Sequence, residues 1–262
     1  MRYLSRRDLE SIGVNVIAAY KVLPQNSGRL ERIDIDCLVE NLLGLHIDYR
    51  HLSRACDTLG LTSFSEIGVE VFPESSNATE EMFYMLDGKT ILIESNLIRE
   101  GANIGRRNYT VAHECCHHIM RRLFPHDYDV QSKARTVHYC YRSRAGARNW
   151  EEWQVETLAG IILLPVECVL CGMDCFGLGR RIRLLNRIFA PETYNRFAQM
   201  AAFLGVSKTA LAIRMEQLNL IERNDLQDPY ALLSIDMDEE TWNDEPCNKD
   251  CQEMSEMRQA HI

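Results

Sequence analysis

TVAHECCHHIM, residues 110–120, is the stretch that decides the fold of this chain, because it joins a helical pattern to a metal-binding pattern. Each residue advances by about 100° along an α-helix, so His113 and His117 lie about 40° apart on one face. Two imidazoles one turn apart can hold one metal ion, and zinc accepts nitrogen and oxygen ligands in a tetrahedral site. Glu114 is offset from both histidines and can face a water on the metal. The pattern therefore predicts a zinc site with His113 and His117 as ligands and Glu114 as the proton-transferring group.

The downstream segment NWEEWQVETLAGIILLP, residues 149–165, offers the third protein ligand that a catalytic zinc needs. Glu151, Glu152 and Glu156 stand at the start of an otherwise apolar helix, where carboxylates are costly unless a cation neutralises them. Glu152 and Glu156 share a helical face, which favours one zinc ligand and one supporting carboxylate that holds a ligand imidazole by its other ring N–H. The alternative is a solvated first turn, in which acidic residues interact favourably with the helix dipole.

Apolar spacing and turn residues predict a mainly helical chain with a small antiparallel sheet. Two β-rich runs, residues 81–86 and 90–95, flank Asp87-Gly88, a dipeptide typical of hairpin turns. Residues 121–149 are basic and lack a clean period, so they are interpreted as a long loop. A short strand is expected at 46–52. The predicted helices span residues 6–20, 33–44, 106–124 and 149–170, the last broken at Pro165.

Residues 191–221 predict two helices around Gly205-Val206-Ser207, which is a helix-turn-helix pattern. DNA recognition would use basic and polar side chains of the second helix, which are Lys208, Thr209 and Arg214. Apolar residues dominate that helix between positions 210 and 213. A packed helical pair is therefore favoured over DNA binding.

The net charge of −9 over 262 residues is concentrated at one end of the chain. From Glu222 onward there are 12 acidic and 3 basic residues, and the remaining 221 residues carry 26 of each. Residues 1–221 therefore have no net positive charge that would favour strong nonspecific binding to nucleic acid. The acidic end is expected to be disordered.

The sequence carries no sign of export or of a membrane span. No run approaches the roughly 18 apolar residues of a membrane helix, and the basic start MRYLSRRDLE has no apolar core behind it. The ten cysteines are accordingly expected to be reduced thiols. A cytoplasmic protein with no membrane partner is the expectation.

The histidine-rich segment and the glutamate-containing segment together resemble those of one known family. RRNYTVAHECCHHIM, residues 106–120, resembles the R-x-x-F-T-x-A-H-E-x-G-H segment of the ImmA/IrrE zinc metallopeptidases, and EWQVETLAGIILLP, residues 152–165, resembles their E-W-Q-A-N-x-F-A-x-x-L-L-M-P segment. The likeness extends over roughly residues 10–221. It implies His113 and His117 as ligands, Glu114 as the catalytic acid/base and Glu152, rather than Glu151, as the third ligand.

This chain departs from the family pattern at several positions. Cys116 replaces a common Gly, and Val155 and Leu158 replace Ala and Phe. Glu156 stands where the family usually has Asn or Asp, and the interval between His117 and Glu152 is long for the family. None of these changes removes a ligand.

The predicted fold is α+β, in three parts. The resemblance implies a mainly helical, zincin-like metallopeptidase domain with a small antiparallel sheet at 1–175, followed by a helix-turn-helix-like region at 176–222. The charge pattern adds an acidic tail at 223–262, which is expected to be disordered. The implied function is an intracellular zinc-dependent endopeptidase that cleaves a regulatory protein, such as a helix-turn-helix repressor encoded nearby on a mobile element. The alternatives are a non-catalytic, zinc-containing transcriptional regulator and an antitoxin-like binding protein.

Peptide hydrolysis would also need a donor to the developing oxyanion besides the metal. Five side chains lie in the right stretch, and the sequence does not choose among them: His126, Tyr128, His138, Tyr139 and Tyr141.

Overall fold

The structure is a computed structural model that describes residues 2–26, 30–73, 82–127, 137–141 and 150–233. Met1–Pro229 form one compact unit and Tyr230–Ile262 a second. The first unit combines helices with small mixed sheets, so the predicted α+β class is confirmed.

The helices and strands have the following bounds. The helices are α1 (Arg6–Val22), α2 (Ile35–Cys37), α3 (Ile104–Leu123), α5 (Trp150–Leu163), α6 (Val166–Cys175), α7 (Pro191–Phe203) and α8 (Lys208–Gln217). The strands are β1 (His46–Arg50), β2 (Thr58–Ser63), β3 (Glu66–Val71), β4 (Met82–Asp87), β5 (Thr90–Glu94), β6 (Val137–Tyr141), β7 (Ile182–Leu185) and β8 (Ile221–Asn224). Short helical turns are η1 (Pro24–Asn26), η2 (Leu38–Leu42), η3 (Ser95–Leu97) and, in the second unit, η4 (Ala231–Leu233).

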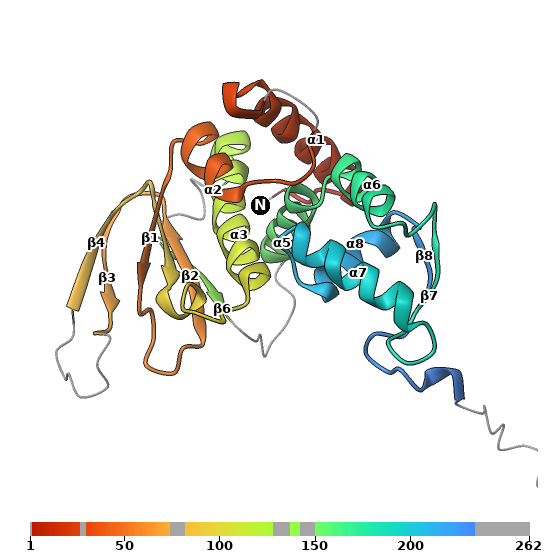
Figure 1. Cartoon of the computed structure of the whole chain (residues 1–262). Coiled ribbons are helices and arrows are strands. Elements are labelled where there is room, and N and C mark those ends of the chain that lie inside the picture. The colour runs from red at the N-terminus through yellow and green to blue at the C-terminus, as the bar shows by residue number, and fades with distance from the viewer. Residues whose placement is uncertain (1, 27–29, 74–81, 128–136, 142–149, 234–262) are drawn as a thin grey trace, which may run out of the picture. The chain divides into compact units, whose positions relative to one another are not determined.

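Helix α3 is the centre of the fold and lies between the four-stranded sheet and α5 (Figure 1). It begins where the side chain of Asn103 accepts a hydrogen bond from the Arg106 amide, and it ends before Pro125. Cys115 and Cys116 are fully buried in the main hydrophobic core. The helix predicted from the histidine-rich stretch is therefore confirmed, and it runs through the interior.

The main sheet has the strand order β1-β5-β2-β6 and is mixed. β1 pairs with β5 in parallel, whereas β5 with β2 and β2 with β6 are antiparallel. The predicted small antiparallel sheet is therefore corrected to a mixed one, because β1 and β5, which are distant in sequence, pair in parallel. Local spacing carries no signal for such a pairing.

The Asp87-Gly88 dipeptide does not form a hairpin turn, which corrects the prediction. β4 pairs with β3 and β5 pairs with β2 in one continuous register, with Gly60 opposite Ile93 and Glu66 opposite Asp87. Gly88 has φ +76°, and a Cβ there would come within 2.9 Å of the Phe64 backbone. The positive φ of Gly88 thus bends a long antiparallel ladder, which continues from the β2–β5 pair of one sheet into the β3–β4 pair of the other. The β3–β4 connection includes residues 74–81, which lie outside the described residues.

Strand β6 lies within the segment that was predicted to be a loop. Its side chains alternate, with Cys140 buried and Tyr139 and Tyr141 exposed. The inward face carries His138 and Cys140 instead of large apolar residues. The strand could therefore not be predicted from alternation of hydrophobic and polar residues. The flanking residues 128–136 and 142–149 are not among the described residues.

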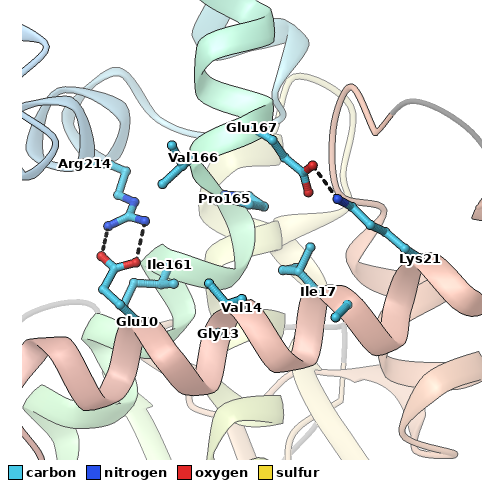
Figure 2. A pocket seen from close by; sticks show the side chains of 11 residues that line it. Glu10, Gly13, Val14, Ile17, Lys21, Ile161, Pro165, Val166, Glu167 and Arg214 are labelled. Atoms are coloured by element: carbon cyan, nitrogen blue, oxygen red, sulfur yellow. Dashed lines mark hydrogen bonds and ion pairs between the residues drawn. The ribbon is translucent and has the colours of Figure 1, made fainter.

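Helix α1 crosses α5 at Gly13, where a Cβ would lie 2.4 Å from Cγ2 of Ile161. Beside this crossing is a cavity of about 330 Å³ with an apolar floor. An ion pair stands at each end: Arg214 with Glu10 and Lys21 with Glu167 (Figure 2). None of the residues that line this cavity belongs to the histidine-rich motif.

The two helices predicted around Gly205-Val206-Ser207 are confirmed as α7 and α8. Gly205 has φ +68°, and the Ser207 hydroxyl accepts a hydrogen bond from the Ala210 amide. Arg214 is 2% exposed and points to Glu10 rather than to an outer face. The parallel pair β7–β8 was not predicted, and the predicted boundary between residues 175 and 176 stays a prediction.

Within the described residues, no single helix has the length and apolar composition needed to cross a membrane. Only the bent pair of α5 and α6, with 46° between them, meets those two criteria together.

Candidate metal centre

Two helices bring together the three residues expected to hold a metal. α3 supplies His113 and His117, whose ring centroids are 5.0 Å apart, and the first turn of α5 supplies Glu152. Oε2 of Glu152 lies 3.3 Å from Nε2 of His113, and its Oε1 lies 3.7 Å from Nε2 of His117. Ligands at about 2.1 Å from a tetrahedral ion lie about 3.4 Å from one another. The three side chains therefore have the spacing of ligands around a single ion.

The burial of this group also fits a cation. His113 and His117 are almost completely buried. Neither ring nitrogen of His113 makes a hydrogen bond within the described part of the chain, although a buried imidazole normally has a partner. A metal ion would take the lone pair of one of these nitrogens. The ligand atoms of His113, His117 and Glu152 all lie within 4.8 Å of one another, and this group can hold a metal ion.

Glu114 is buried on the side of α3 that faces strand β2. A Cβ at Gly60 of β2 would lie 3.0 Å from Oε1 of Glu114 and 2.7 Å from Cγ2 of Thr110. Glycine at position 60 thus lets the sheet approach α3 closely enough to cover the carboxylate. The packing restricts where the Glu114 carboxylate can lie next to His113.

Strand β6 brings two further donors to the site. The His138 ring lies 4.3 Å from the His117 ring, centroid to centroid. Ligand atoms of His117, His138 and Glu151 form a second group within 4.8 Å, and those of His113, Glu114 and Cys140 form a third. Cys140 was not predicted from the sequence to lie at the site. The signal available was the alternation of His138 and Cys140 along VHYCY, which places both on one face of a strand.

Among the four oxyanion candidates that the structure describes, His138 lies beside His117, one of the candidate ligands. Tyr139 and Tyr141 point to the other face of β6, where their rings stack 6.1 Å apart. His126 is exposed, and Tyr128 lies outside the described residues.

His118 is turned away from the other two histidines of α3. Its Nε2 lies 2.7 Å from Oγ1 of Thr62, and its ring packs edge-on against Phe64 at 5.0 Å. Burial, together with the charges of Arg122 and Arg121, lowers the pKa of His118 to about 4. His118 is therefore a neutral packing residue that binds the sheet to α3.

The two remaining acidic candidates of α5 differ in what surrounds them. Glu151 belongs to the group with His117 and His138. For Glu156, the backbone carbonyl lies 3.5 Å from the Tyr109 hydroxyl, which donates to it. The supporting role of the Glu156 carboxylate behind a ligand imidazole stays a prediction.

The donor set of two histidines and one glutamate on packed helices defines an α+β protein with a metal-capable centre. No protein-family model matches the sequence, and no curated protein matches it either. The function is accordingly inferred from the chemistry of the centre itself.

Proposed function

We propose that this protein is a zinc-dependent endopeptidase. The observation that carries the proposal is the approach of one Glu152 carboxylate to both His113 and His117, in a buried centre that also includes Glu114. Two histidines and a glutamate form a ligand set that zinc hydrolases use. The resemblance of both motifs to the ImmA/IrrE metallopeptidases supports the same activity.

Three side chains would hold the ion, and a fourth would move the proton. His113, His117 and Glu152 are the ligands, each imidazole neutral so that it can donate its lone pair. When bound, zinc supplies a Lewis acid that polarises the peptide carbonyl and acidifies water. The Glu114 carboxylate accepts a proton from the attacking water and passes it to the leaving peptide nitrogen. Gly60 of β2 packs against this carboxylate, which would limit its movement during the transfer.

His138 is proposed to donate a hydrogen bond to the carbonyl oxygen as negative charge develops there. Its position beside His117 places the ring at the border of the metal centre. β6 is the last strand in the sheet order, and its outer edge pairs with no strand of the described chain. An extended peptide could add to this edge through main-chain hydrogen bonds, which would present its carbonyl groups to the centre.

A regulatory protein is the proposed substrate class, and a helix-turn-helix repressor encoded nearby is its expected member. This assignment rests on the family resemblance and would place the reaction in the cytoplasm. The inward Arg214 and the hydrogen bond from Lys208 to the Tyr194 hydroxyl favour packing over DNA recognition for α8.

The test is a comparison of Glu114→Gln with the unaltered protein. Both are purified, their zinc content is measured, and both are incubated with a peptide library and with the neighbouring repressor, with cleavage followed by mass spectrometry. Glu114→Gln is expected to keep its zinc and to lose at least about a hundredfold in cleavage, because general acid–base catalysis is removed. Equal cleavage by both proteins, or an unaltered protein that binds no metal, would overturn the proposal. Metal retained without any cleavage by either protein would favour the non-catalytic regulator.

A further inference from the structure

Helix α6 carries two thiols that neither the candidate metal centre nor the proposed reaction uses. Cys171 and Cys175 are about one helical turn apart, so they share a face of the helix. Their Sγ atoms lie 4.0 Å apart. Cys171 is 4% exposed, whereas Cys175, the last residue of α6, is exposed. One buried and one accessible sulfur thus lie side by side at the end of a helix.

The distance between the two sulfurs fits a shared metal ion. A metal–thiolate bond is about 2.3 Å long, so two sulfurs on one ion lie from about 3.8 Å apart at a tetrahedral angle to about 4.6 Å apart at a linear one. The observed 4.0 Å lies within this range. The two side chains can therefore hold an ion without rearrangement of α6, and solvent reaches the pair at Cys175.

The number of donors decides which ion the pair would take. Among the described residues, every group of three or more donors that could hold a metal includes His113 or His117, and none includes a residue of α6. A structural zinc needs four protein ligands, which two thiolates do not provide. Monovalent copper is a soft ion that favours thiolate donors and is satisfied by two of them. The pair therefore suits Cu⁺ rather than Zn²⁺.

A third thiol on the same helix has a different environment. Cys168 is completely buried, and its thiol donates to the Leu30 carbonyl oxygen, 3.7 Å away. Burial, together with the charges of Glu167 and Cys171, raises the pKa of Cys168 to about 12. Cys168 is therefore a neutral core residue at neutral pH, and it offers a matched control on the same helix.

We propose that Cys171 and Cys175 form a binding site for a monovalent copper ion, separate from the histidine-containing centre. As Cu⁺ binds, both S–H bonds break, two Cu–S bonds form, and the two protons pass to solvent. No electron is transferred, because copper arrives and stays as Cu⁺. The inference does not rest on the proposed peptidase function, since it uses no residue of the centre on α3 and α5.

Competition with a chromophoric Cu⁺ chelator gives the first test. The full chain, with one equivalent of zinc present, is titrated with Cu⁺ in the absence of oxygen. The unaltered protein is expected to retain one Cu⁺, and Cys175→Ser to bind it about a hundredfold more weakly, because one of two thiolates is lost. Cys168→Ala and Cys37→Ser, the matched controls, should retain the ion. Equal retention by Cys175→Ser and the unaltered protein, or no retention by the unaltered protein, would overturn the inference.

Alkylation shows whether both sulfurs hold the ion. Cu⁺ is expected to slow the reaction of iodoacetamide with Cys175 by at least about tenfold, measured by peptide mass spectrometry, because a metal-bound thiolate is protected. In Cys171→Ala, which keeps only one thiol of the pair, this protection should largely disappear. Full protection of Cys175 in that variant would count against a shared site.

Glu152→Ala separates the copper site from the histidine-containing centre. This variant lacks a candidate zinc ligand and is expected to retain Cu⁺ as tightly as the unaltered protein does, whereas Cys175→Ser should keep its zinc. If Glu152→Ala weakens Cu⁺ binding as much as Cys175→Ser does, the ion belongs to the other centre and the inference is rejected. If neither protein binds zinc but the thiol pair retains Cu⁺, the peptidase proposal fails and the copper site stands.

Discussion

Oε2 of Glu152 on α5 lies 3.3 Å from Nε2 of His113 on α3, and the same carboxylate also approaches His117. A single side chain from the first turn of one helix thus connects to two side chains at the middle of another. A metal ion shared by these residues would hold the two helices together. Metal binding, catalysis and stability are therefore expected to be coupled in this protein.

The choice between adjacent glutamates gives a direct prediction. Glu152→Gln is expected to lower zinc affinity by at least about tenfold, because a charged ligand is lost, whereas Glu151→Gln should change it little. Equilibrium dialysis or competition with a chromophoric chelator measures both. If Glu151→Gln shows the larger loss, the ion belongs instead to the group formed by His117, His138 and Glu151.

Removing the metal should lower thermal stability. A ligand at 100 times its Kd stabilises the native state by about 2.7 kcal/mol, which corresponds to about 5–10 °C in the Tm of a unit of this size. Calorimetry with zinc and with chelator should show this shift in Glu114→Gln as well. Glu152→Ala should show a much smaller one, and a full shift in that variant would remove Glu152 from the ligand set.

Gly60→Ala should damage catalysis while sparing metal binding. The added methyl group would meet Glu114 Oε1 at 3.0 Å and Thr110 at 2.7 Å, so the carboxylate or the strand must move. Cleavage is expected to fall by about a hundredfold, as for other small displacements of a catalytic group. Gly68→Ala is the matched control, because a Cβ there meets only the Met85 sulfur, at 3.3 Å. Equal activity of the two variants would contradict the close packing over Glu114.

The two ion pairs beside the α1 cavity should differ in their contribution to stability (Figure 2). Glu10→Gln leaves the buried Arg214 without its charged partner and is expected to cost about 2 kcal/mol, below the full range for a buried pair because Glu10 is partly exposed. Lys21→Met breaks the exposed pair with Glu167 and should cost less than about 1 kcal/mol. Urea unfolding of both variants measures the difference, and similar costs would argue against a special role for Arg214.

Tyr20 should make the fold sensitive to alkaline pH. Burial raises the pKa of Tyr20 to about 12, and its hydroxyl oxygen accepts a hydrogen bond from the Asp34 amide at 3.2 Å. An unfolded chain releases the hydroxyl proton of a tyrosine near pH 10. The contribution of the neutral Tyr20 hydroxyl to the free energy of unfolding is therefore complete below about pH 10 and is lost as pH rises through about 12. Tyr20→Phe should unfold at lower urea concentration at neutral pH but lose less stability between about pH 10 and pH 12. Parallel pH profiles of the two proteins would contradict this assignment.

Much of the candidate metal centre was predictable because two of its three candidate ligands are close together in sequence. His113 and His117 are one helical turn apart, so their common face follows from helix geometry alone. The apolar run of α5 and its break at Pro165 are equally local, since proline cannot continue a helix. The Asp87-Gly88 dipeptide could not be interpreted from local sequence alone. A positive φ at Gly88 was predictable, but the strands that pair with β4 and β5 determine whether the chain forms a hairpin turn or a bend there.

The sequence by itself determined the helices, the spacing of the two histidines on α3 and the few glutamates that are candidates for the third ligand. Only the tertiary structure decided that Glu152 faces both histidines, that His138 lies beside His117 and that Cys140 lies near His113 and Glu114. The physical reason is that periodicity specifies which face of an element a side chain occupies. Which faces meet depends on long-range packing, here on a glycine in β2 that lets the sheet close over α3.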